Sequence, residues 1–265
     1  MIQALTTADV PAIVELLRQT GLEGAAANFT RYLRWQPDGA WGLLDNGALV
    51  GSVTLLRFGS VGFVGCMAVA PALQAQGRGR ALLEHAHTAG RRAGVTTFLL
   101  EATASGRRLY ENLGYTVDHE TWVGARKPAA ASDDLVELGA ARAEILALDR
   151  RATGTPRDLM IGDLIDHRRG GLERRADGAV VGYGLVVGDR LGPVIARDPG
   201  AGRALIDRLA GGCSVVGVPM PNEPAVAAAA AAGFAQTRTL TRMRLGPPVG
   251  GDPAWCWALA SPGAG

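Results

Sequence analysis

The sequence predicts a mixed α/β protein of two domains. Its 265 residues suit two domains of ordinary size, and a hydrophobic content of 48% supports a core in each. Segments with strand-like and helical patterns follow one another through the first half, in an order that mixes both types. Pieces of the first half then recur in altered form in the second, so we expect a repeated architecture.

The first half is expected to contain, in chain order, a strand at 2–5, helices at 8–19 and 26–35, strands at 41–44, 48–56 and 63–70, a helix at 79–93, a strand at 96–102, a helix at 106–113 and a strand at 115–123. Thr7 can cap the first helix, and Gly21 ends it. The second helix carries Phe29 and Leu33 on one face and stops at Pro37.

The later elements of the first half rest on turn residues and apolar content. Asn46 and Gly47 supply the positive φ angles of a tight turn, which makes a hairpin of the strands on either side. The segment 63–70 is apolar almost throughout, so we expect a strand buried on both faces. The next helix turns Leu82 and Ala86 inward.

Composition excludes several classes of partner. The net charge is only +2, from 27 basic and 25 acidic residues without a basic run, which disfavours nucleic acid. The three cysteines are widely spaced, which suits a reducing compartment. His85 and His87 point to different sides of a helix, so no metal site is expected. The sequence has neither a leader pattern nor a membrane-spanning apolar run, and we expect a cytoplasmic protein with no membrane partner.

The segment 69–83 is the most informative part of the chain. An apolar strand ends at Pro71, and a turn containing Gly77 and Gly79 opens a helix. The first N–H groups of a helix lack intrahelical acceptors and carry the positive end of the helix dipole, so an anion can bind there. Glycines let the backbone approach such an anion closely. A glycine turn can also serve chain geometry alone, so the motif needs its context.

The order of elements and two motifs resemble the GCN5-related N-acetyltransferase (GNAT) superfamily, over nearly all of residues 1–125. The first motif is Gln-Ala-Gln-Gly-Arg-Gly at 74–79, after Val-Ala-Pro at 69–71. The second is Leu-Tyr-Glu-Asn-Leu-Gly-Tyr at 109–115. The resemblance implies a mixed, mostly antiparallel sheet flanked by helices and split by the pantetheine arm of acetyl-CoA.

The resemblance also implies a cofactor site. Backbone groups of Met67, Ala68 and Val69 would pair with the pantetheine as if it were a strand. The amides of the glycine turn would hold the pyrophosphate, with Arg78 or Arg80 near the other phosphates, and Ser105 lies where relatives often have an asparagine that contacts the pantetheine. The expected cofactor-binding residues are therefore Met67, Ala68, Val69, Gln74, Gln76, Gly77, Arg78, Gly79, Arg80 and Ser105.

Transfer to an amine requires an acid and a base. The amine must lose a proton before it attacks the thioester, and the departing thiolate is helped by receiving one. The resemblance gives Tyr110 the acid role, because a phenol is protonated at neutral pH; its alternative is packing against the sheet. The strand 62–69 has no glutamate, unlike many relatives, which leaves Glu101 as the candidate base. A structural ion pair with Arg107 or Arg108 is the alternative for Glu101.

Cys66 could be an acyl-carrying nucleophile by residue type. It lies in an apolar strand and has no adjacent base, so we expect a buried core thiol.

The second half resembles a degenerate copy of the first. A linker at 127–133 divides a catalytic domain at 1–126 from a GNAT-like domain at 134–265. The segment 197–202 keeps the form Arg-x-x-Gly-x-Gly, but Pro199 removes an amide donor and Asp198 adds negative charge where phosphate would lie. Ala229 stands in the position of Tyr110 and supplies no acid.

The second half is also similar to the carboxy-terminal domain of a bacterial subgroup of tandem acetyltransferases. The matching segments are 148–151, 182–183, 192–198 and 240–243. The similarity implies that this domain packs on the first and shapes the acceptor pocket. Asp149, Arg150 and Arg157 are candidate polar contacts, with structural ion pairing as their alternative.

These observations predict an acyl-CoA-dependent N-acyltransferase that uses acetyl-CoA or another acyl-CoA and no metal. The expected acceptor is a small-molecule or peptide amine, and the expected assembly is a monomer or homodimer. The alternative is a non-catalytic acyl-CoA sensor or scaffold. A plain dinucleotide-binding domain is disfavoured, because it needs repeated strand-helix alternation and an acidic residue about 20 positions after the glycine turn.

Overall fold

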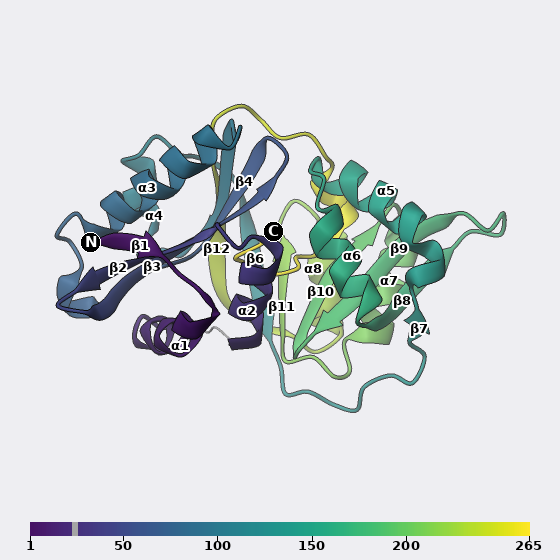
Figure 1. Cartoon of the computed structure of the whole chain (residues 1–265). Coiled ribbons are helices and arrows are strands. Elements are labelled where there is room, and N and C mark those ends of the chain that lie inside the picture. Colours follow the sequence, from purple (N-terminus) through teal and green to yellow (C-terminus); the bar gives the residue numbers. More distant parts are fainter. Residues whose placement is uncertain (23–25) are drawn as a thin grey trace.

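The computed structural model describes residues 1–22 and 26–265. Its strands form one continuous mixed sheet in the order β1-β2-β3-β4-β5-β12-β6-β11-β10-β9-β8-β7, with β13 paired to β10 (Figure 1). The first half contributes β1 (Ile2–Ala4), α1 (Val10–Gln19), α2 (Ala26–Trp35), β2 (Ala40–Asp45), β3 (Ala48–Phe58), β4 (Val61–Val69), α3 (Arg78–Arg92), β5 (Thr97–Ala102), α4 (Arg107–Glu111) and β6 (Thr116–Ala125).

The second half repeats this succession of elements. It contributes β7 (Val136–Glu137), α5 (Arg142–Thr153), α6 (Asp158–Asp166), β8 (Arg169–Arg174), β9 (Val180–Val187), β10 (Arg190–Ala196), α7 (Pro199–Leu209), β11 (Val215–Pro219), α8 (Glu223–Ala231), β12 (Ala235–Leu245) and β13 (Cys256–Ala258). Figure 1 shows the two halves side by side, with the last residues of the chain lying between them.

The two halves exchange strands at the centre of the sheet. β12 of the second half lies between β5 and β6 and is antiparallel to both, with Arg242 opposite Glu101 and His119. β6 of the first half in turn pairs with β11, Thr121 lying opposite Pro219. Each half therefore completes its sheet with a strand supplied by the other.

Four buried clusters form the core. One lies under α1 and α2, one joins α3 and α4 to the sheet, and one joins α7 and α8 to the sheet of the second half. The fourth contains Tyr32 of α2, Phe63 of β4 and apolar residues of α5 and α6, so it spans both halves. A further contact between the halves is a hydrogen bond from Trp35 Nε1 to Asp163 Oδ2 (2.9 Å).

The expected mixed α/β architecture is confirmed, with small shifts at element ends. Asn46 (φ +49°) and Gly47 (φ +80°) form the predicted hairpin turn. The first helix begins as a 3₁₀ turn over Thr7–Asp9, and its cap is Thr6 rather than Thr7. Thr6 and Asp9 form a capping box, in which Thr6 N donates to Asp9 Oδ2 (2.7 Å).

Candidate functional site

A gap opens between β4 and β5 in the first half. The two parallel strands pair only from Val61–Thr97 to Phe63–Leu99, and they part beyond that point. A bulge in β4 accompanies the opening: Cys66 has φ +47°, and its carbonyl accepts a hydrogen bond from Ser52 Oγ (2.8 Å). The distal half of β4 thus keeps β3 as a partner on one edge and has a free edge on the other.

The free edge of β4 exposes only some of the backbone groups that were predicted to pair with the pantetheine, those of Met67, Ala68 and Val69. Ala70 N donates to Val50 O on β3, so strand alternation turns Ala68 toward β3 and turns Met67 and Val69 toward the gap. The Val69 carbonyl already accepts a hydrogen bond from Gln74 Nε2 (2.9 Å). Both backbone groups of Met67 and the N–H of Val69 remain on the gap side.

The turn that follows β4 presents a row of amide donors. Gly77 has φ +75° and occupies the N-cap of α3, a left-handed conformation that favours glycine. Within the described part of the chain, no main-chain or side-chain acceptor lies in hydrogen-bond reach of the amides from Gln76 to Arg80. The α3 helix has 15 residues, so its N-terminus can attract an anion.

The two arginines of this turn are engaged by neighbouring carboxylates. Arg78 Nη1 lies 3.1 Å from Asp45 Oδ2, and Arg80 Nε lies 2.9 Å from Glu84 Oε1. Gly79 has a packing role, because a Cβ there would lie 3.3 Å from both the Leu109 and the Met67 side chain. The glycine therefore allows α3 to approach β4 and α4.

Tyr110 is the buried aromatic residue of α4. Its ring meets Tyr115 edge-on at 5.7 Å, and burial raises the pKa of Tyr110 to about 12. Among the described residues, nothing hydrogen-bonds to its hydroxyl, whereas the hydroxyl of Tyr115 lies 2.8 Å from His87 Nε2. The phenol of Tyr110 is thus protonated at neutral pH and has a hydroxyl free to donate.

Glu101 carries a buried carboxylate with one free oxygen. Arg242 Nε of β12 donates to Glu101 Oε1 (2.6 Å), and Glu101 Oε2 has no partner among the described residues. The Arg242 guanidinium also lies 4.9 Å from the centroid of the Phe63 ring. Glu101 thus makes an ion pair of the kind given as its alternative, but with Arg242, whereas Arg107 pairs with Glu111 (2.7 Å).

Arg242 and His119 are site neighbours that the sequence does not predict. Arg242 belongs to a segment that matches tandem acetyltransferases, but its pairing with a residue 141 positions away leaves no local signal. His119 is directly opposite Arg242. Burial, with a contribution from Arg242, lowers the pKa of His119 to about 4, so its imidazole is neutral at pH 7. Both side chains line a cavity of about 310 Å³ beside Phe63 and Leu99.

The remaining first-half candidates occupy ordinary structural positions. Ser105 lies in the loop before α4, with its Oγ 3.1 Å from Thr103 Oγ1. Burial raises the pKa of Cys66 to about 11, which agrees with a core thiol rather than a nucleophile. In the residues that the structure describes, no group of three or more His, Cys, Asp or Glu side chains is placed to hold a metal ion.

The second half fills its corresponding gap with its own chain. β10 and β11 pair only at Arg190–Val215 and Leu191–Val216, and β13 then pairs with β10. Asn222 Nδ2, in the loop equivalent to that of Ser105, donates to the carbonyls of Ala254 (2.8 Å) and Cys256 (3.0 Å). The segment around β13 therefore lies where an extended ligand would enter.

The N-terminus of α7 is also blocked at the position that corresponds to the candidate phosphate site of α3. Asp198 Oδ1 caps the helix by accepting from Ala201 N (2.9 Å), and Pro199 occupies the first turn. The ring of Trp257 lies directly against Gly202, leaving no room for a Cβ there. Ala229 is fully buried in α8. These positions agree with the sequence argument about Asp198 and Pro199.

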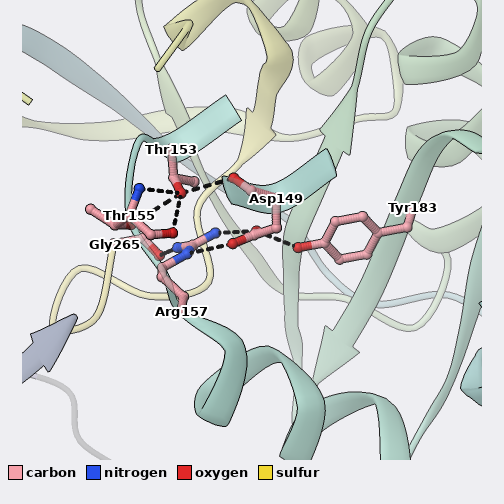
Figure 2. A network of polar contacts seen from close by, with 6 residues as sticks. All are labelled: Asp149, Thr153, Thr155, Arg157, Tyr183 and Gly265. Carbon is pink, nitrogen blue, oxygen red and sulfur yellow. Dashed lines mark hydrogen bonds and ion pairs between the residues drawn. The ribbon is translucent and has the colours of Figure 1, made fainter. Parts of the chain in front are cut away.

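Asp149 and Arg157 form a buried network that supports the second half (Figure 2). Arg157 donates to both carboxylate oxygens of Asp149 (2.6 and 3.1 Å) and to the carbonyl of Gly265 (2.7 Å). Tyr183 donates its hydroxyl to Asp149 Oδ1 (2.6 Å). Arg150 pairs separately with Asp158 (2.8 Å). These three candidates thus make structural ion pairs.

Comparison with known proteins gives a consistent result. Family models described as acetyltransferase (GNAT) domain match residues 36–117 and 145–253, which together are more than half of the chain. No curated protein sequence matches. Within the described ranges, no helix has the length and apolar character needed to traverse a bilayer.

Solved structures share the tandem fold. A proposed acetyltransferase from Pyrococcus horikoshii has a TM-score of 0.85 at 20% identity, covering 100% of this chain and 95% of that one. A GCN5-related N-acetyltransferase from Sphaerobacter thermophilus has a TM-score of 0.67 at 19% identity, covering 95% and 97%. One from Kribbella flavida has a TM-score of 0.57 at 14% identity, covering 92% and 70%.

Proposed function

The chain belongs to the acetyltransferase (GNAT) family, and we propose on that basis that it transfers an acetyl group from acetyl-CoA directly to a primary amine. The observation that carries the proposal is the gap between β4 and β5, which leads to unpaired amides at the start of α3. A free strand edge next to a helix N-terminus suits a ligand that has an amide-bearing arm and phosphates.

The cofactor would lie along β4 and end at α3. Met67 and the Val69 N–H would bind the pantetheine arm, and the amides from Gln76 to Arg80 would bind the pyrophosphate. Arg78 and Arg80 would have to turn from Asp45 and Glu84 to reach further phosphates. When bound, acetyl-CoA supplies an activated thioester, so no covalent enzyme intermediate is needed.

Tyr110 and Glu101 divide the proton transfers in this proposal. The raised pKa of Tyr110 keeps its proton in place until a thiolate accepts it. Glu101 Oε2, which has no hydrogen-bond partner in the described part of the chain, would bind the ammonium of the acceptor or take its proton directly or through water. Arg242 holds the other oxygen and fixes the orientation of the carboxylate.

The second half would bind no cofactor. β13 fills its gap, and Asp198 and Pro199 close its helix start. We therefore expect one CoA per chain, measured by calorimetric titration. A stoichiometry of two would overturn this part of the proposal.

Turnover tests the proposal. The protein is mixed with acetyl-CoA and a panel of amines, and free thiol is measured. Tyr110→Phe is expected to lower kcat by roughly 100-fold, since general acid catalysis contributes about 10²–10⁴-fold. Tyr115→Phe is the matched control, because that hydroxyl is bound to His87 instead. Equal losses in the two variants would remove Tyr110 from the acid role.

A sensor or scaffold that binds acyl-CoA without turnover is the second candidate. It is favoured by the absence of an acidic residue in β4 and by the engagement of Glu101 with Arg242. Tight CoA binding without thiol release for any amine would support this alternative and exclude the transferase.

A further inference from the structure

A cavity of about 1040 Å³ lies between the two halves. Residues of α1, α2 and α6 line it, together with the end of β6, the start of β12 and the strand ends near Asp189 and Val215. Ala260, Ser261 and Ala264 also belong to the lining. A volume near the upper end of small-molecule sites allows a ligand larger than a simple amine.

The charge of this cavity is strongly one-sided. Among the described residues, five arginines from both halves line it, and the one carboxylate of this lining is that of Asp189, which is hydrogen-bonded to Ser214 Oγ. Arg18 pairs with Glu15, which lies outside the lining (2.8 Å). The arginines are Arg18, Arg31, Arg126, Arg190 and Arg238. This excess contrasts with the near balance of the whole chain, which has 27 basic and 25 acidic residues.

The smaller cavity provides an internal comparison. Each of its three arginines has its own carboxylate: Arg157 pairs with Asp149 (2.6 Å), Arg242 with Glu101 (2.6 Å) and Arg244 with Asp118 (2.9 Å). The fold therefore neutralises arginine charges where they serve structure.

Three arginines of the larger cavity lack such neutralisation. In the described ranges of the chain, no carboxylate lies within ion-pair distance of Arg31, Arg126 or Arg238. Arg31 donates to the amide oxygen of Asn28, and Arg126 donates to main-chain carbonyls. Burial, with a contribution from the charge of Arg168, lowers the pKa of Arg31, and the charge of Asp163 acts in the opposite direction.

The cavity also lies next to the strand that would hold the thioester. Tyr32 lines it and shares a hydrogen bond with Ser261 (2.8 Å between oxygens). Gly263 then packs on β4, because a Cβ at Gly65 would lie 2.7 Å from its carbonyl. The segment 261–263 therefore contacts both the lining of the basic cavity, through Ser261, and the bulged part of β4, through Gly263.

Resting on the proposed transferase function, we propose that this cavity holds the acceptor and that the acceptor is a small amine bearing a carboxylate or phosphate group. Arg31, Arg126 and Arg238 bind the anionic group through charge-assisted hydrogen bonds, and the amine points toward β4. Recognition therefore uses both halves, since Arg238 lies on the strand exchanged from the second half.

The first test compares amines that differ only in the anionic group. Amino acids are compared with their amides, and O-phosphoethanolamine with ethanolamine, in the thiol-release assay. The anionic member of the preferred pair is expected to have a kcat/KM at least tenfold higher, and which pair shows the difference identifies carboxylate or phosphate. Equal rates within both pairs would overturn the inference and leave the transferase function standing.

The second test measures binding without turnover. Glutarate, inorganic phosphate and neutral glutaramide are titrated by calorimetry into protein saturated with CoA, so that the α3 site is occupied. We expect glutarate or phosphate to bind, and glutaramide not to bind. Arg31→Gln and Arg238→Gln should each weaken anion binding roughly tenfold.

Arg175→Gln is the matched control, since Arg175 lies outside both cavities. It should leave anion binding unchanged. Absence of anion binding, or equal losses in all three variants, would overturn the anion site whatever the turnover assay shows. Anion binding that depends on Arg31 and Arg238, without any thiol release, would preserve the site and overturn the transferase function instead.

Discussion

Glu101 has one carboxylate oxygen bound to Arg242 and one buried oxygen with no partner among the described residues, and we expect different roles for the two. The bound oxygen compensates a guanidinium whose side chain is only 13% exposed. In the proposed function, the other oxygen would bind the ammonium of the acceptor. A substitution at Glu101 therefore alters stability and chemistry together, and the two effects need to be separated.

Glu101→Gln is expected to lower the free energy of unfolding by about 3 kcal/mol, because the buried Arg242 loses its counter-charge. The double variant Glu101→Gln with Arg242→Gln should regain most of that stability. Its kcat should nevertheless stay low, because the carboxylate is still missing. Urea unfolding and thiol release measure the two quantities. Recovery of kcat in the double variant would make Glu101 a purely structural residue.

His87 is expected to make stability depend on pH. Burial, with a contribution from Arg91, lowers the pKa of His87 from 6.5 to about 4, so the folded state favours the neutral ring. The unfolded chain takes up a proton as pH falls below 6.5, and the folded chain does so only near pH 4. The contribution of neutral His87 to stability is therefore complete above pH 6.5 and is lost as the pH falls from 6.5 to about 4.

The measurement is the urea midpoint at neutral pH and at about pH 5. His87→Gln should reduce the fall in the urea midpoint between these two pH values, although His119 will still cause part of that fall. The exposed His167 is the control, and His167→Gln should leave the fall unchanged. A fall of the same size in both variants would remove His87 from the explanation.

At the scale of elements, the turn into α3 combines backbone conformation with ligand access. Gly77 and Gly94 flank the same helix with φ values of +75° and +88°, and a Cβ at either would enter open space. Replacing either glycine by alanine should thus have a similar conformational cost. Of the two, only Gly77 belongs to the row of amides that have no acceptor among the described residues. Substitutions at Gly77 and Gly94 therefore distinguish the effect of backbone strain from an effect on ligand binding.

Gly77→Ala and Gly94→Ala are each expected to lower stability by about 1 kcal/mol, from the cost of a left-handed non-glycine residue. Only Gly77→Ala should also weaken CoA binding, by several-fold, because its strain shifts the amides of the turn. Thermal unfolding and calorimetric titration measure these effects. Equal CoA affinities in the two variants would argue against phosphate binding at this turn.

Local patterns in the sequence predicted the elements better than their partners. The hairpin at Asn46 and Gly47 and the glycine turn each depend on neighbouring residues, and each is present. Tyr110 packs against Tyr115, as its alternative expects, and its role as the acid stays a prediction. The partner of Glu101 depends on the register of β12, which pairs with β5 across more than a hundred positions. The local sequence therefore indicates an ion pair as the alternative for Glu101, whereas the identity of the arginine, Arg242 in place of Arg107 or Arg108, depends on the strand register.

At the scale of the whole molecule, the exchange of β12 and β6 joins the halves into one sheet. Removing either strand would leave open edges in both halves. The cluster around Tyr32, Phe63 and the α5 and α6 helices adds a shared core. The segment 127–133, which the sequence predicts to be a linker, contains no helix or strand, and a single sheet joins the elements on either side of it.

The two halves are therefore expected to unfold together. Leu82→Ala in the first half and Leu205→Ala in the second remove fully buried side chains, and each should cost about 2–5 kcal/mol. Scanning calorimetry should show a single transition in the native protein and in both variants, with equal calorimetric and van't Hoff enthalpies. A transition that splits in either variant would indicate independent halves.

The segment around β13 has a consequence for competition. Because it is part of the same chain, its effective concentration at the second gap is fixed by tethering and can reach the millimolar range. A free ligand must therefore displace an occupant that never diffuses away. Under the proposed function, a rising acyl-CoA concentration would therefore fill the first gap and leave the second closed. The second half would then contribute a wall to the proposed acceptor cavity without binding a second cofactor.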